Sequence, residues 1–130
     1  MQIVNTHEIE GEIIPDPYKR LIKIVFSSDK NNIPEINFSS VSIFPKSRTD
    51  YHGHDRPELI YIVSGEGMLN CNQKEYKLKE GIVIWLTEKD NHQIINTGND
   101  FLKIVTVFVP GYNSNELLGK IIETAEKDKK

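Results

Sequence analysis

Two histidines and a glutamate stand close together in the segment from Tyr51 to Gly65. His52 and His54 are two residues apart, and Glu58 follows His54 after three intervening residues. Imidazole nitrogens and carboxylate oxygens are ligands of divalent transition metals. Side chains two residues apart in an extended chain leave the same face, so both imidazoles can reach one ion. The segment therefore predicts a metal site with three of its ligands.

A fourth ligand has to come from elsewhere in the chain, where His7 and His92 are the remaining histidines. His7 lies in a weakly structured lead-in, and a lone histidine in such a place usually binds nothing. His92 follows the polar TEKDN segment and begins an apolar run. Burying ligand-type side chains without an ion costs free energy. We therefore expect His92 to complete the site.

The composition favours one soluble domain. The chain has 130 residues, of which 38% are hydrophobic and 27% charged, and its net charge is -3. This balance gives no basic patch for nucleic acid, and no apolar run approaches the roughly 20 residues that span a bilayer. The single cysteine, Cys71, cannot form an intrachain disulfide, and the first residues lack the pattern of a signal peptide. We expect a cytoplasmic protein that binds neither nucleic acid nor membrane.

The hydrophobic pattern predicts an all-β core over residues 21–110, preceded by an irregular lead-in over residues 1–20. In the second predicted strand, residues 35–44, the apolar residues change from even to odd positions near Ser39 and Ser40, which indicates a bulge or bend. Many short apolar runs separated by turns are typical of an antiparallel sandwich or barrel. The predicted strands are 21–26, 35–44, 58–64, 67–71, 75–78, 82–86, 92–96 and 101–109.

The tail has a different period. Its apolar residues form one stripe of an amphipathic helix over residues 113–128, and Asn113 or Ser114 can cap its start. The helix could close one end of the barrel or contact another subunit. The stripe consists of Leu117, Leu118, Ile121, Ile122 and Ala125.

The spacing of the candidate ligands resembles a known family. The pattern His52-x-His54-x3-Glu58-x6-Gly65 resembles the first sequence motif of the cupin superfamily. A second pattern is similar in spacing to the other cupin motif: Gly81-x5-Thr87-x-Lys89-x2-His92-x3-Asn96. The resemblance covers about residues 40 to 110. Three positions depart from the family pattern, with Lys46 and Lys89 where glycine is usual and Thr87 where proline is usual.

This resemblance implies one cupin domain over residues 1–130, folded as a double-stranded β-helix, a small jelly-roll barrel, with a short C-terminal helix. It also implies that His52, His54, Glu58 and His92 bind one divalent transition metal, for which Fe, Mn, Ni, Co and Zn all suit the ligand set.

Strand alternation indicates which neighbours face the site. Ile60 and Ile62 share the parity of Glu58, and Ile94 and Asn96 share that of His92. Asn96 could orient a bound group or cap a turn. Arg48 could hold a carboxylate or phosphate or lie exposed in a loop. The substrate-pocket candidates are Arg48, Tyr51, Ile60, Ile62, Ile94, Asn96 and Thr106.

The opposite parity predicts an apolar outer face. Leu59, Tyr61, Val63 and Ile95 would form a surface that a monomer rarely leaves in water. We therefore expect a homodimer, unless the lead-in or the second sheet covers these residues.

Three functions were compared with these observations. We expect a metal-dependent cupin enzyme acting on a small polar organic molecule, as a dioxygenase, isomerase, decarboxylase or lyase. The alternative is a cupin that binds a metal or a small ligand without turnover. A sensor fused to a DNA-binding helical module is not expected, since one tail helix leaves no room for that module.

Overall fold

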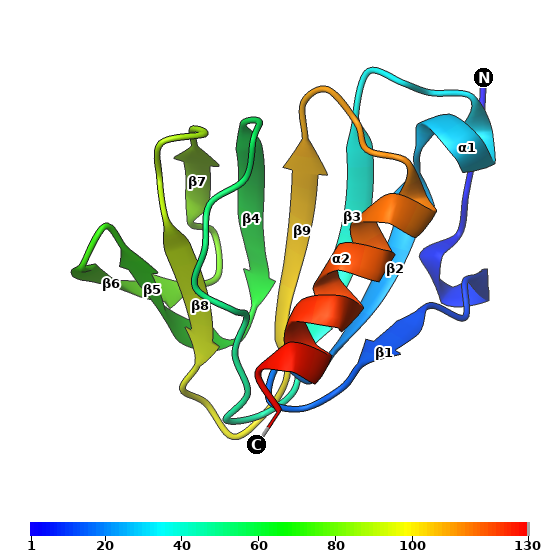
Figure 1. Ribbon diagram of the computed structural model, residues 1–130. Helices are drawn as coiled ribbons and strands as arrows, with labels where there is room; N and C mark the ends of the chain where they lie inside the picture. The colour runs from blue at the N-terminus through cyan, green and yellow to red at the C-terminus, as the bar shows by residue number, and fades with distance from the viewer. Residues whose placement is uncertain (130) are drawn as a thin grey trace.

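The strands form two antiparallel sheets, and the C-terminal helix lies over one half of the larger sheet (Figure 1). The computed structural model describes residues 1–129. The six-stranded sheet has the order β1-β2-β3-β9-β4-β7, and the three-stranded sheet has the order β6-β5-β8. The strands are β1 Glu12–Ile14, β2 Arg20–Phe26, β3 Asn37–Ile43, β4 Glu58–Ser64, β5 Glu66–Cys71, β6 Lys74–Lys79, β7 Val83–Leu86, β8 His92–Asn96 and β9 Leu102–Phe108. The predicted all-β jelly roll is confirmed.

Alternation of side chains along the strands builds the core. In β4, Glu58, Ile60 and Ile62 are buried between the sheets, whereas Tyr61 and Val63 are each 43% exposed on the outer face. This pattern arises because successive side chains of a strand point to opposite faces of the sheet. The inner face of β4 therefore carries both a core segment and, at its first residue, a carboxylate.

The predicted bulge in the second strand is wrong. β3 pairs with β9 in unbroken register, and Asn37, Ser39, Val41 and Ile43 are all buried on its inner face. The first residues on this inner face, Asn37 and Ser39, are polar, so the sequence suggested that the inward positions changed along the strand. Asn37 is enclosed because its amide donates to the carbonyl oxygen of Tyr112 at 2.8 Å. The register shift lies instead in β2, between Ile24 and Phe26.

The lead-in is more ordered than predicted. It contains a short 3-10 helix, η1 (Thr6–Glu8), and strand β1, which extends the larger sheet by pairing with β2. A four-residue helix, α1 (Ser28–Asn31), was also not predicted. These elements are too short to show a periodicity in sequence.

The C-terminal helix α2 (Ser114–Lys127) agrees with the prediction. The side chain of Asn113 caps it, accepting from the backbone N–H groups of Asn115 and Glu116 at 3.0 and 3.3 Å. Leu117 and Ala125 are buried on its inner face. Among the described residues, no helix has the length and apolar character needed to cross a bilayer.

Gly65 and Lys46 are among the described residues with a positive φ. Gly65, between β4 and β5, has φ +97°, and a Cβ there would lie 2.7 Å from the carbonyl oxygen of Phe101. Only glycine fits this close approach. Lys46 has φ +65°, so the chain keeps a glycine-like backbone at one of the positions where the sequence departs from the cupin pattern.

Candidate metal centre

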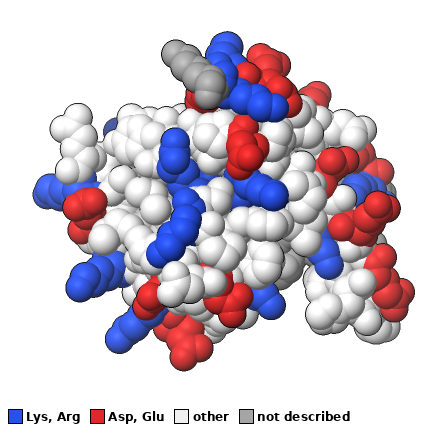
Figure 2. All heavy atoms as spheres, turned by 90° about the horizontal axis from the view of Figure 1, so that it is seen from below, with Lys and Arg blue, Asp and Glu red and all other residues white. Residues whose placement is uncertain are grey.

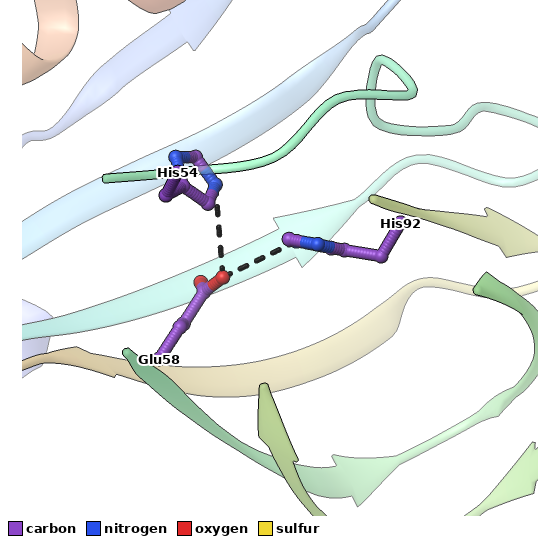
Figure 3. Close-up of side chains that lie close together, drawn as sticks. All are labelled: His54, Glu58 and His92. Atoms are coloured by element: carbon purple, nitrogen blue, oxygen red, sulfur yellow. Dashed lines mark ion pairs between the residues drawn. The ribbon is translucent and has the colours of Figure 1, made fainter. Parts of the chain in front are cut away.

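Three of the four predicted ligands converge at one end of the space between the sheets. Ligand atoms of His54, Glu58 and His92 all lie within 4.8 Å of one another. Glu58 Oε1 is 3.7 Å from His54 Nε2 and 3.3 Å from His92 Nε2. In Figure 3 both imidazoles point toward this carboxylate oxygen. The arrangement could hold one metal ion.

Strand pairing explains how residues far apart in sequence meet here. Glu58 is the first residue of β4, and His92 is the first residue of β8 in the other sheet. The backbones of His52 and His92 form an isolated antiparallel bridge, with N···O distances of 3.2 and 3.1 Å in the two directions. This bridge fixes the segment that carries His52 and His54 beside the start of β8.

The carboxylate of Glu58 has an unsatisfied oxygen. Oε1 is buried and has no hydrogen-bond partner among the described residues, because its contact with His92 Nε2 lacks hydrogen-bond geometry. Burying an unpartnered carboxylate oxygen is costly. A divalent ion between the three side chains would satisfy this oxygen and accept the imidazole lone pairs. The residues present therefore fit a metal.

A neighbouring carbonyl orients the ring of His92. Its Nδ1 lies 3.1 Å from the carbonyl oxygen of Asp90. Since a carbonyl only accepts, Nδ1 carries a proton, which leaves Nε2, on the side of Glu58, as the nitrogen that could bind a metal. Asp90 is itself held in the turn, where its carboxylate accepts from the backbone N–H of Thr87 at 2.9 Å. The turn thus positions a ligand, although Thr87 replaces the usual proline.

The electrostatic environment shifts the pKa values of the two candidate ligand histidines in opposite directions. Burial, followed by the positive charges of His52 and His92, lowers the pKa of His54 to about 3. Burial also lowers the pKa of His92, but its contact with Glu58 outweighs this and raises the pKa above the ordinary value. His54 is therefore in the neutral, ligand-competent form throughout the physiological pH range.

His52 lies beside the cluster of three but outside it. Its side chain is 44% exposed, and its Nδ1 pairs with the carboxylate of Asp50. The centre of its ring is 4.5 Å from that of His54 and 6.5 Å from that of His92. Burial raises the pKa of Asp50, but the hydrogen bond and charge of His52 outweigh it and lower the pKa overall. Its role as a fourth ligand stays a prediction.

A cavity with a volume of about 80 Å³ adjoins the cluster. Its walls are mostly apolar, and α2 contributes Leu117 and Ile121, so the helix covers part of the cavity as the sequence suggested. Since one water takes up roughly 10–15 Å³ of such space, the cavity holds a molecule of about six non-hydrogen atoms. The other residues that line it are Arg20, Ile22, Ser39, Val41, Thr49, Asp50, His52, His54, Glu58, Ile60, His92, Ile94, Ile104, Thr106 and Phe108.

The structure divides the predicted pocket residues into two groups. Ile60, Ile94 and Thr106 line the cavity, whereas Arg48, Tyr51, Ile62 and Asn96 lie outside its lining. Tyr51 is 44% exposed, and Ile62 is buried in the core.

Two of the polar candidates have contacts away from the cavity. The guanidinium of Arg48 lies 5.6 Å from the ring centre of Tyr18. The Asn96 side chain donates to the carbonyl oxygens of Ile43, Phe44 and Asp100 and accepts from the backbone N–H of Gly98. Asn96 therefore has the turn-capping role weighed from the sequence.

Sequence reasoning missed a cationic residue in the cavity wall. Arg20, the first residue of β2, is only 6% exposed and lines the cavity. It shares the inward parity of Ile22 and Ile24, which is a signal present in the sequence. The signal was missed because a charged residue at a strand start usually lies in water.

Comparison with known proteins gives relatives consistent with this geometry. A family profile described as the AraC-like ligand binding domain matches residues 42–113. An L-ectoine synthase of Bordetella petrii is 30% identical over 83 residues, which is 62% of this chain and 62% of that protein. An oxalate-binding protein of Thermotoga maritima is 33% identical over 73 residues, 55% of this chain and 60% of that protein. The chain thus spans less than two thirds of either relative.

A solved structure shows the same arrangement of strands. The crystal structure of a protein described as a predicted oxalate decarboxylase from Thermotoga maritima superposes with a TM-score of 0.77 at 26% identity. The superposition covers 84% of this chain and 99% of that chain.

Proposed function

The chain belongs to the family of the AraC-like ligand binding domain, a cupin-type domain. We propose that it is a metal-dependent enzyme acting on a small polar organic molecule. The reaction is of the dioxygenase, isomerase, decarboxylase or lyase type. Residues 1–130 form one cupin domain in this proposal. The ion is a divalent transition metal from the set Fe, Mn, Ni, Co and Zn.

One observation carries the proposal. The buried, unpartnered oxygen of Glu58 faces two imidazole nitrogens at the end of a cavity large enough for a small molecule. A purely structural cluster would satisfy this oxygen with a hydrogen bond. Ligands that leave positions open beside a cavity are typical of a site where a substrate reaches the metal.

Each residue of the site has a role in this proposal. His54, Glu58, His92 and His52 hold the ion, and Asp50 orients His52 through its Nδ1. A bound divalent ion would act as a Lewis acid toward an oxygen of the substrate. The apolar walls exclude water, which strengthens the electrostatic interactions of the ligand inside the cavity.

A second function is favoured by the names of the relatives. The family is described as a ligand binding domain, and one relative is named an oxalate-binding protein. A cupin that holds a metal or small ligand without turnover would use the same residues.

A turnover assay separates the two functions. Metal-free protein is reloaded with Fe(II), Mn(II), Ni(II), Co(II) or Zn(II) and incubated with a panel of small polar acids, sugars and amines, with and without oxygen. We expect product from at least one compound with wild-type protein and none with His92→Ala. Binding of a compound without product, with every metal, would favour the non-catalytic cupin. Equal product formation by His92→Ala would contradict a role for this site.

A further inference from the structure

A buried guanidinium faces the cavity without forming an ion pair to a described residue. Arg20 is only 6% exposed, and no carboxylate of residues 1–129 makes an ion pair with it within 4.0 Å. Its one hydrogen bond to a described residue runs from Nη1 to the carbonyl oxygen of Tyr18, at 3.0 Å. The other N–H groups of its planar fork are therefore available to a ligand.

The neighbouring carboxylates of Asp50 and Glu58 contact histidines rather than Arg20. Asp50 pairs with His52, and Glu58 faces the two ligand histidines. Burial lowers the pKa of Arg20 to about 10, while the charges of Asp50 and Glu58 oppose this shift. Arg20 is thus charged at neutral pH. A buried charge is retained at a cost that a binding partner would offset.

We propose that Arg20 binds the carboxylate of the natural ligand, which is a small monocarboxylate whose other end lies toward the metal centre. This inference rests on the proposed function for the role of the metal. A guanidinium holds a carboxylate through two parallel hydrogen bonds. With a divalent ion bound and the histidines neutral, the charges of the ion and Arg20 exceed those of Asp50 and Glu58 by one positive charge. A single carboxylate balances that charge.

The cavity beside Arg20 suits a small ligand. Its room for about six non-hydrogen atoms fits a two- or three-carbon acid such as glycolate, lactate or pyruvate, and a second cavity of about 230 Å³ shares His52, His54 and Leu117 with it. The apolar residues Ile22, Ile104 and Leu117 line the same space. They favour a short hydrocarbon part over a second charged group.

The test compares carboxylates with their neutral amides. Acetate, glycolate, lactate and pyruvate, each paired with its primary amide, are titrated at constant ionic strength into metal-free and Mn(II)-loaded protein, and binding is followed by NMR. We expect at least one acid to bind the wild type about tenfold more tightly than its amide, as a charge-assisted bidentate contact implies.

Variants assign this preference to one residue. Arg20→Met keeps the length of the side chain without its charge and should lose the preference, while Arg20→Lys should retain part of it. Arg48→Gln is the matched control, because Arg48 is exposed and lies outside the cavity lining, and it should bind as the wild type does. Thermal unfolding of each variant verifies that it is folded.

Three results would overturn the proposal. These are no preference for any acid in the wild type, an unchanged preference in folded Arg20→Met, or loss of the preference in Arg48→Gln. Metal content is measured on the same samples. Absence of metal with carboxylate binding intact would refute the proposed function alone, and metal binding without carboxylate preference would refute only the role of Arg20.

Discussion

At the scale of single residues, the site depends on which nitrogen or oxygen each side chain presents. Asp90 holds His92 through Nδ1, and Asp50 holds His52 through the same atom. In both rings Nε2 is left for another partner. Asp90 is an unspecified position of the second motif and Asp50 precedes the first, which is why the sequence indicated the candidate ligands but not what orients them.

Metal affinity should fall as the pH falls. The pKa of His92 is raised above its ordinary value of 6.5 in the metal-free protein. Protons therefore compete with the metal for His92 as the pH falls through this raised pKa. His54, with a pKa of about 3, stays neutral throughout this range. Competition with a chromophoric chelator at pH 8, 7 and 6 measures the affinity. An affinity that is constant from pH 8 to 6 would count against His92 as a ligand, and His7→Ala should follow the wild-type curve.

The sequence predicted the convergence of three candidate ligands better than it predicted the cavity wall. His54, Glu58 and His92 have types and spacing with few explanations other than a metal, so their convergence could be foreseen. Arg20 shares the inward parity of Ile22 and Ile24, but the predicted strand begins after it, so the sequence indicated Arg48 instead. Leu117 and Ile121 line the cavity because α2 packs over the larger sheet near β2 and β3.

At the scale of elements, alternation predicted the long strands, and long-range contacts explain what it missed. β1 has three residues and depends on β2 for its hydrogen bonds. The short helix α1 is joined to α2 because Asp29 accepts from the backbone N–H of Ser114 at 2.8 Å and from its hydroxyl. Such pairings link residues far apart in the chain, so no local pattern reveals them.

The N-cap of α2 should stabilise the fold. Asn113→Ala removes the acceptor for two backbone N–H groups and should lower the free energy of unfolding by about 1 kcal/mol. Chemical denaturation measures this change. Asn115→Ala is the control, since this exposed side chain makes no hydrogen bond to a described residue, and it should change stability by less than about 0.5 kcal/mol. Equal effects of the two substitutions would contradict the capping role.

At the scale of the whole molecule, charge and apolar surface are distributed differently. Basic and acidic side chains are both spread over the face seen in Figure 2. The outer face of β4 and β7 instead gathers exposed apolar residues, with Tyr61 and Val63 joined by Val83 at 59% and Trp85 at 56% exposure. An apolar face of this kind is typical of a protein contact.

We expect this outer face to form a homodimer. Light scattering after size-exclusion chromatography should give twice the mass of one chain, and Trp85→Glu should give the monomer because a buried unpaired charge is costly. Tyr76→Glu, a matched change at an exposed aromatic residue of β6 in the other sheet, should leave the dimer intact. A monodisperse wild-type monomer would show this prediction to be wrong.

We propose that this molecule holds one divalent ion at Glu58 and its neighbouring imidazoles. Calorimetric titration of metal-free protein with Co(II) and Zn(II) measures this binding directly. The predicted result is saturation at one ion per chain, with an affinity at least about 100-fold lower in Glu58→Gln and unchanged in Glu75→Gln, an exposed glutamate of β6. Failure to saturate at one ion per chain, or equal affinity of the wild type and Glu58→Gln, would contradict the claim.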